Sequence, residues 1–113
     1  MKRGEIYYAD LNPTVGSEIN KKRPVLIVSN NANNKVATTI TILPITSNIK
    51  MVYPFEVTLP GNESGLPKSS KIQCQQIRTI SKLRVNSSPV GFVNKLIMKQ
   101  VEQALKLHLD FIS

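Results

Sequence analysis

The sequence predicts a mostly β fold: a small, partly open barrel capped by one helix near the C-terminal end. The prediction rests on short apolar stretches with the period-2 pattern of strands, on turn residues between them, and on one later stretch with helical spacing. The 113 residues are enough for one domain with a real core and too few for two. We therefore expect a single domain over residues 1–113.

The first two strands are expected near the N-terminus. Residues 4–9 form the first, with Ile6 and Tyr8 on its buried face, and a turn beginning at Asp10 ends it. After a polar loop, residues 25–28 are continuously apolar, as in a central strand covered on both faces. The Asn-rich residues 29–34 then close this strand as a turn.

Two further strands are predicted from alternating side chains. Residues 38–43 alternate Thr with Ile until Pro44, which is expected to interrupt the strand because it has no amide hydrogen. In residues 53–59, Glu56 and Thr58 are expected to point outward. The inward set there is Tyr53, Phe55, Val57 and Leu59.

Residues 70–80 do not fit one regular strand, because their apolar side chains change parity. Ile72 and Cys74 occupy even positions, and Ile77 occupies an odd one. Either a β-bulge at Gln75 and Gln76 inserts an extra residue, or two separate strands meet there at an irregular bend. Both alternatives display two amide side chains at a backbone irregularity.

One helix is expected, beginning after Asn94, whose side chain is a good N-cap. A brief extended piece at residues 90–93 precedes it. The apolar residues of the helix recur at helical spacing and are expected to form the face that packs on the sheet. They are Leu96, Ile97, Val101, Ala104, Leu105 and Leu109.

Positive charge dominates the chain, with 15 Lys and Arg against 7 Asp and Glu and a net charge of +8. Such a field attracts polyanions, although a solvated basic surface has the same composition. The longest basic run is Lys21-Lys22-Arg23. The charge is therefore spread over a folded surface, which suits a groove better than a disordered basic arm.

Several classes of function are disfavoured. The N-terminal residues contain no apolar signal segment, and no apolar run is long enough to cross a bilayer, so we expect a cytoplasmic protein with no membrane partner. Cys74 and His108 are single residues of their kinds. Neither a disulfide nor a transition-metal site is therefore expected, and no metal or other cofactor is predicted.

Short motifs form an ordered series along nearly the whole chain. They are Arg3-Gly4-Glu5-Ile6-Tyr7, Asp10-Leu11-Asn12-Pro13, Gly16-Ser17-Glu18, Arg23-Pro24-Val25-Leu26-Ile27-Val28-Ser29-Asn30, Pro44-Ile45-Thr46, Ser64-Gly65-Leu66 and Gln76-Ile77-Arg78-Thr79-Ile80. No single motif is specific, but the series as a whole resembles the MazF/PemK (Kid) family of toxins from bacterial toxin–antitoxin systems.

The resemblance implies a fold, an activity and partners. The fold is a Src-homology-3-like barrel of the CcdB/PemK type with a C-terminal helix, assembled as a homodimer. The activity is sequence-specific, metal-independent cleavage of single-stranded mRNA by an endoribonuclease (an mRNA interferase), which leaves 2′,3′-cyclic phosphate and 5′-hydroxyl ends. The other partner is a cognate acidic, MazE-like antitoxin, which competes with RNA for the basic groove.

The resemblance also implies site residues, with Arg23 and Thr46 as the catalytic pair. The chemistry agrees, because Pro24 restricts the backbone of Arg23 to an extended conformation and a guanidinium matches two phosphate oxygens. Thr46 can donate a hydrogen bond to the same phosphate. Glu18 is either the base or an ion-pair partner that orients Arg23. The RNA-binding candidates are Ser17, Lys22, Asn30, Ser70, Gln75 and Gln76.

Gln75 departs from the family pattern, in which an acidic residue is common at this place. The proton acceptor is therefore unassigned. Two other functions stay open: a non-catalytic RNA-binding or antitoxin-binding module, and a gyrase-poisoning toxin like CcdB, which the absence of Trp from the sequence disfavours. The presence of both Arg23 and Thr46 favours the nuclease.

Overall fold

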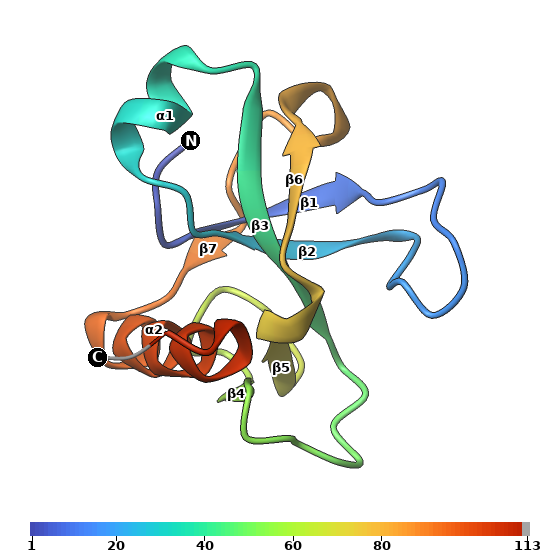
Figure 1. Ribbon diagram of the computed structural model, residues 1–113, viewed down its shortest axis with the longest axis vertical. Coiled ribbons are helices and arrows are strands. Elements are labelled where there is room, and N and C mark those ends of the chain that lie inside the picture. The colour runs from blue at the N-terminus through green and yellow to red at the C-terminus, as the bar shows by residue number, and fades with distance from the viewer. Residues whose placement is uncertain (112–113) are drawn as a thin grey trace.

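The computed structural model describes residues 1–111 as one curled sheet with a long helix packed against it (Figure 1). The strands are β1 (Glu5–Asp10), β2 (Lys22–Ile27), β3 (Thr39–Thr46), β4 (Glu56–Leu59), β5 (Ser70–Gln73), β6 (Arg78–Ser81) and β7 (Gly91–Phe92). The helices are α1 (Asn31–Val36) and α2 (Lys95–Leu109), and the 3-10 turns are η1 (Cys74–Gln76) and η2 (Lys82–Arg84).

β3 is the centre of the sheet, whose strand order is β4-β5-β3-β2-β1-β7 with β6 also paired to β3. All pairs are antiparallel. The first half of β3 pairs with β6 and its last two residues pair with β5, while β2 lies along its other edge. This change of partners along one strand curls the sheet. The mostly β, partly open barrel with a C-terminal helix is confirmed.

Both faces of the sheet are buried. One core cluster packs against α2 and includes Leu26 and Val101, and the other is enclosed by the curled sheet and includes Val25 and Ile27. Consecutive residues of β2 alternate between the two clusters, so Val25, Leu26 and Ile27 are all fully buried. The central strand covered on both faces is therefore confirmed.

Tyr7, and not Tyr8, is the buried tyrosine of β1. Ile6 is fully buried as predicted, but Tyr7 is only 4% exposed and Tyr8 is 36% exposed. The prediction that Tyr8 fills the core is wrong, because β1 also contributes its other face to the cluster inside the curled sheet. Tyr8 instead lines a surface pocket.

A short helix, α1, occupies most of the segment that was expected to be a turn at residues 29–34. Asn30 caps it, since its Oδ1 accepts a hydrogen bond from the Asn33 amide at 2.8 Å. Asn34 is 2% exposed, and its carbonyl accepts a hydrogen bond from Lys82 Nζ at 2.6 Å. The cap and the tertiary contact outweigh the low helix propensity of Asn, which explains the incorrect prediction.

Pro44 does not interrupt its strand. β3 continues to Thr46, and Pro44 pairs with Val25 of β2. Pro44 lies between the residues that pair with β6 and those that pair with β5. The missing amide hydrogen therefore falls where β3 changes partners, and the strand tolerates it.

A 3-10 turn, η1, separates β5 from β6, so the second of the two alternatives for residues 70–80 is correct. Two strands meet at an irregular bend, and there is no single bulged strand. Cys74 is fully buried in this bend, as expected for a core residue. Burial, together with the negative charge of Glu56, raises the pKa of the Cys74 thiol to about 12.

β4 begins at Glu56, so Tyr53 and Phe55 precede the strand and do not form part of its inward face. Val57 and Leu59 are buried as predicted. The prediction that Glu56 points outward is wrong, because Glu56 is 7% exposed and forms an ion pair with Lys71 of β5.

Asn94 caps α2 as predicted, because its Oδ1 accepts a hydrogen bond from the Ile97 amide at 2.8 Å. Ile97, Val101 and Ala104 form the buried face. Leu96 and Leu109, also predicted to pack on the sheet, are instead 65% and 40% exposed, so the buried stripe is narrower than the apolar pattern. Within residues 1–111, no helix is long and apolar enough to cross a membrane.

Candidate functional site

A surface pocket of about 380 Å³ opens where β2 begins and β3 ends. Arg23 and Thr46, the two residues predicted to act on a phosphate, both line it. The β2–β3 register pairs Val25 with Pro44, and the same register continued by two residues puts Arg23 opposite Thr46. Strand pairing therefore brings together two side chains that are far apart in the sequence.

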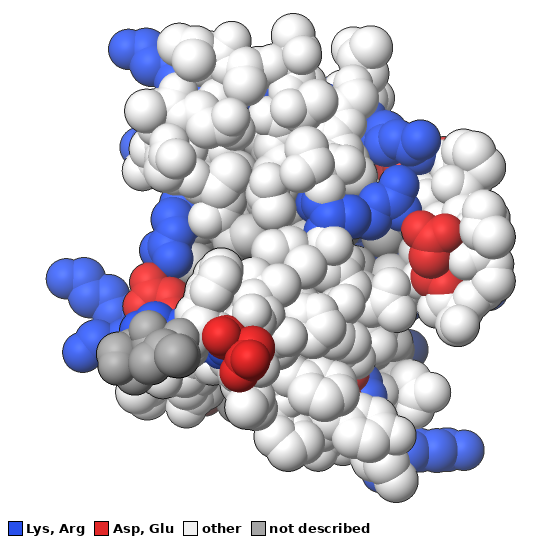
Figure 2. Space-filling view, viewed as in Figure 1, with Lys and Arg blue, Asp and Glu red and all other residues white. Residues whose placement is uncertain are grey.

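The pocket is positively charged. Its ionisable side chains, apart from Tyr8, are Lys22, Arg23 and Lys68, and no Asp or Glu lines it. Figure 2 shows Lys and Arg side chains gathered over β1 and β2, beside the connection between these strands. A concave surface lined by one sign of charge raises the local concentration of anionic ligands.

Arg23 is oriented and has no anionic partner. Its Nε donates a hydrogen bond to the Asn20 carbonyl at 2.6 Å. Partial burial lowers its pKa, but a guanidinium stays protonated. No carboxylate within residues 1–111 pairs with it. The two terminal guanidinium nitrogens, Nη1 and Nη2, are thus available to donate to an anion such as phosphate.

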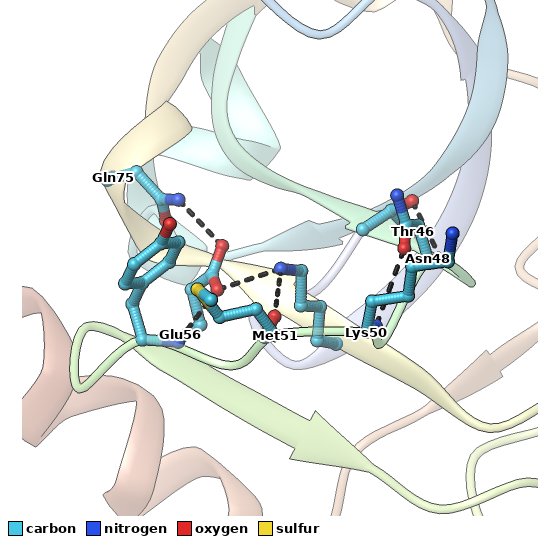
Figure 3. Close-up of polar contacts among 8 residues, drawn as sticks. Thr46, Asn48, Lys50, Met51, Glu56 and Gln75 are labelled. Atoms are coloured by element: carbon cyan, nitrogen blue, oxygen red, sulfur yellow. Dashed lines mark hydrogen bonds and ion pairs between the residues drawn. The ribbon is translucent and has the colours of Figure 1, made fainter.

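Thr46 ends β3 with its hydroxyl free to donate. Thr46 Oγ1 accepts a hydrogen bond from the Asn48 amide at 3.2 Å, and Asn48 Oδ1 accepts one in turn from the Lys50 amide at 3.4 Å (Figure 3). Because a hydroxyl group both accepts and donates, the hydrogen of Thr46 can still reach a ligand in the pocket.

Glu18 lies outside the pocket, on the exposed connection between β1 and β2. Its Oε1 accepts a hydrogen bond from the Val15 amide at 2.8 Å. The ion pairs formed within the described chain are Arg3–Glu102 and Lys71–Glu56. The predicted ion pair of Glu18 with Arg23 is therefore not formed in this conformation, and the role of Glu18 as a base stays a prediction.

The predicted RNA-binding residues fall into two groups. Lys22 and Ser70 line the pocket together with Arg23 and Thr46, the predicted catalytic pair. Ser70 is only 4% exposed, and its hydroxyl donates to the Lys68 carbonyl at 3.1 Å. Ser17 and Asn30 are exposed residues outside the pocket. The side chain of Asn30 is used as the cap of α1.

Gln75 and Gln76 both have protein partners at the η1 bend. Gln76 Oε1 accepts from the Ile19 amide at 3.3 Å and its Nε2 donates to the Ser17 carbonyl at 3.5 Å, so this side chain holds the β1–β2 connection. Gln75 Nε2 donates to Glu56 Oε2 at 2.7 Å (Figure 3). Neither amide lines the pocket, and base recognition by them stays a prediction.

Sequence reasoning missed some of the pocket lining, including Tyr8, Ser47, Pro67 and Lys68. Lys68 comes from the long connection between β4 and β5. Leu66, in the same connection, is 4% exposed and belongs to the core cluster under α2. Leu66 is an isolated apolar residue in a polar loop, and such a residue often anchors a loop to the core. This was the signal in the sequence that could have placed the loop, and Lys68 with it, beside the sheet.

Comparison with known proteins finds relatives that match almost the whole chain. The family model for the PemK-like, MazF-like toxin of type II toxin-antitoxin systems matches residues 2–109. Endoribonuclease MazF9 of Mycobacterium tuberculosis is 46% identical over 118 residues, covering 100% of this chain and 99% of that protein.

Solved structures of other proteins share this fold. A crystal structure of MazF from Deinococcus radiodurans has a TM-score of 0.85 and 25% identity, covering 98% of this chain and 97% of that one. An endoribonuclease from Mycobacterial species in complex with its cognate antitoxin has a TM-score of 0.81 and 25% identity, covering 100% and 98%. By its sequence, its fold and the matched length, the chain belongs to the PemK-like, MazF-like toxins of type II toxin-antitoxin systems.

Proposed function

We propose that the protein is a sequence-specific endoribonuclease, the mRNA interferase toxin of a toxin–antitoxin pair. The observation that carries the proposal is the meeting of Arg23 and Thr46 in one positively charged pocket without a carboxylate. Family membership supports it, as does the name of the 46% identical relative, an endoribonuclease. The substrate is single-stranded RNA, whose phosphates fit the pocket's charge.

The chemistry that these residues support is internal attack by a ribose 2′-hydroxyl on the neighbouring phosphorus. The bond from phosphorus to the 5′-oxygen breaks, and this oxygen takes up a proton from solvent water, which leaves a 2′,3′-cyclic phosphate and a 5′-hydroxyl. Arg23 donates to the non-bridging oxygens as negative charge grows in the transition state, and Thr46 donates to the same phosphate. Because Arg23, Lys22 and Lys68 supply the positive charge, the reaction is proposed to need no metal.

The 2′-hydroxyl must lose a proton during the attack, and Glu18 is the candidate acceptor. Its carboxylate lies on the exposed β1–β2 connection, which Gln76 tethers to the η1 bend. To reach the pocket, Glu18 would have to exchange its hydrogen bond with the Val15 amide for one with the RNA.

The proposed partners follow from the same charge. A net charge of +8 suits RNA and also an acidic, MazE-like antitoxin, and a related mycobacterial endoribonuclease is in complex with its cognate antitoxin. We further propose that the chain is a single domain that forms a homodimer and acts in the bacterial cytoplasm, where mRNA is found.

The proposal is tested by incubating the purified protein with long single-stranded RNA in EDTA and mapping the fragment ends. Arg23→Ala and Thr46→Ala are expected to abolish cleavage, whereas Arg3→Ala, which removes a cation paired with Glu102, should cleave normally. Intact RNA with the unmodified protein would overturn the nuclease, and a requirement for added metal would overturn the metal-free chemistry. Equal cleavage by Arg23→Ala would overturn the site.

A further inference from the structure

The connection from β3 to β4, residues 47–55 and here named the β3–β4 loop, is tethered by a buried ion pair. Lys71 and Glu56 are 8% and 7% exposed, with 2.9 Å between Lys71 Nζ and Glu56 Oε1. Lys71 Nζ also donates to the Met51 carbonyl at 2.6 Å, and Glu56 Oε1 accepts from the Tyr53 amide at 3.0 Å (Figure 3). Two backbone groups of the loop are therefore bonded to the pair.

Gln75 completes this network from the η1 bend by donating to the other carboxylate oxygen of Glu56, at 2.7 Å. A buried ion pair adds little net stability on average, because removing two charges from water costs about as much as their attraction returns. What this pair does specifically is hold the loop, since each of its charged groups bonds to the loop backbone. Whatever the pair contributes to the free energy of unfolding, it fixes the conformation of this loop.

The β3–β4 loop presents apolar side chains to solvent. Ile49, Met51 and Val52 are 44%, 59% and 43% exposed, and Tyr53 is 47% exposed. The Tyr53 ring is nevertheless held in place. It stacks on Phe55 with 5.5 Å between ring centroids and 11° between ring planes, and Lys71 Nζ lies 5.9 Å from its centroid.

The loop also starts at the pocket that Arg23 and Thr46 line. Thr46 and Ser47 line the pocket, and the loop continues from Ser47 to the tethered residues. An oriented aromatic ring with an exposed surface, beside a cation and downstream of a phosphate pocket, has the features of a base-stacking position for a single strand.

We propose that the Lys71–Glu56 ion pair is a positioning device for RNA recognition, which fixes the β3–β4 loop so that Tyr53 stacks on a base of the bound single strand. This stacking contributes to the choice of the sequence that is cleaved. The inference rests on the proposed nuclease function. Lys71 and Glu56 are positioning residues because they act through the loop, and Tyr53 is the residue that touches the RNA.

The first experiment compares the sequences cleaved in long RNA by the unmodified protein, Lys71→Met and Tyr53→Ala. Both variants are expected to cleave with weaker sequence preference and with KM raised about 10-fold, the equivalent of one lost base stack, while kcat changes less. Lys71→Arg, which keeps the charge and the donors, should restore much of the preference. Glu102→Gln is the matched control, because it breaks an exposed 2.9 Å ion pair away from this loop.

Each variant is assayed well below its own midpoint of thermal unfolding, so that a loss of folded protein is not mistaken for a loss of loop positioning. A folded Lys71→Met protein with the unmodified cleavage pattern and KM would overturn the inference. If Lys71→Met does not fold, Tyr53→Ala decides, because it leaves the ion pair in place, and an unchanged pattern would again overturn the inference. Failure of the unmodified protein to cleave would instead overturn the nuclease itself.

A binding measurement tests the stacking without any cleavage. The chain contains no Trp, so Tyr53→Trp introduces a single Trp at the proposed contact, and its emission can be excited selectively over that of Tyr7 and Tyr8. A 2′-O-methyl RNA, which has no attacking hydroxyl, is expected to quench its emission, and Lys71→Met in the same background should weaken the quenching several-fold. Tight binding of this RNA without any quenching would exclude the stack.

Discussion

Arg23 is prepared for an anion by its own neighbours. Pro24 restricts its backbone to an extended conformation, the Asn20 carbonyl accepts a hydrogen bond from its Nε at 2.6 Å, and the residue lines the pocket. Partial burial removes some water from the cation, which lowers its pKa, and no carboxylate in the described chain compensates. A phosphate that enters the pocket therefore meets a charge with unused donors.

Substitution of Arg23 by Lys tests whether cleavage requires the two parallel donors of the guanidinium or only its positive charge. Lysine keeps the positive charge but replaces two parallel donors by a point charge, so kcat/KM is expected to fall about 100-fold. The measurement is the initial rate of cleavage of a short fluorogenic RNA. Lys22→Arg, a conservative exchange at the neighbouring pocket residue, serves as control and should stay within a few-fold. Near-normal activity of Arg23→Lys would contradict the bidentate role.

Glu56 predicts an acid sensitivity of the fold. Burial alone would raise its pKa, but hydrogen bonds from Gln75, the Tyr53 amide and Lys71, with the charge of Lys71, outweigh burial and lower the pKa from its ordinary value of 4.5. A carboxyl group with a lowered pKa in the folded state contributes stability above its ordinary pKa. That stability is lost as the pH falls through the folded value.

We therefore expect the free energy of unfolding to drop between about pH 5 and pH 3, and to drop less in Glu56→Gln, which has no carboxyl group to protonate. Urea unfolding over this range measures both. Glu102→Gln is the control for an exposed carboxylate and should retain the acid dependence of the unmodified protein. An identical pH dependence for Glu56→Gln would contradict the assignment.

At the level of elements, α2 shows the difference between an apolar pattern and a buried face. Leu96 and Val101 both belong to the predicted face, yet Leu96 is 65% exposed and Val101 is fully buried under the sheet. The N-cap at Asn94 was predictable because it involves an amide only three residues later, at Ile97. The width of the buried stripe depends on the curvature of the sheet, which no local pattern contains.

Truncation of these two residues to Ala should have different effects on the free energy of unfolding. Val101→Ala removes two buried methyl groups and leaves a cavity, so the free energy of unfolding is expected to fall by about 2 kcal/mol. Leu96→Ala changes an exposed position in the same helix and should alter it by less than about 0.5 kcal/mol. Urea unfolding measures both, and equal losses for the two variants would contradict the burial that distinguishes them.

At the scale of the whole molecule, the curl of the sheet about β3 creates the site. The paired strands β2 and β3 bring Arg23 and Thr46 to one end, and the connection from β4 to β5 adds Lys68. The net charge of +8 surrounds this pocket with a field that favours any polyanion. Under the proposed function, affinity for RNA is expected to come largely from charge, and selectivity for a sequence from the loops, because contacts to phosphates carry no sequence information.

Salt should weaken RNA binding accordingly. Each phosphate contact in a single strand contributes a slope of about −0.7 to the dependence of log affinity on log salt. Lys22→Gln and Lys68→Gln together are expected to reduce the magnitude of this slope by about 1.4 if both contact phosphates. Titration of 2′-O-methyl RNA at several NaCl concentrations measures it. Arg3→Gln, away from the pocket, should leave the slope unchanged, and an unchanged slope in the double variant would remove the two lysines from the RNA path.

By itself, the sequence determined what depends on near neighbours: the strands around Leu26 and Ile42, the core positions of Val57 and Cys74, and the cap at Asn94. Its motif series also pointed to the family and to the candidate pair of Arg23 and Thr46, whose catalytic role stays a prediction. Local periodicity was sufficient because each of these features is set within a few residues.

Tertiary structure decided what depends on partners far along the chain. Helix α1 forms because Asn34 meets Lys82, Glu56 is buried because it meets Lys71, and Pro44 is tolerated because β3 changes partners there. The shared pocket of Arg23 and Thr46 arises from the register of two strands. Such contacts form only after residues far apart in the sequence have been brought together, at the cost of loop-closure entropy. A local sequence pattern therefore does not predict them.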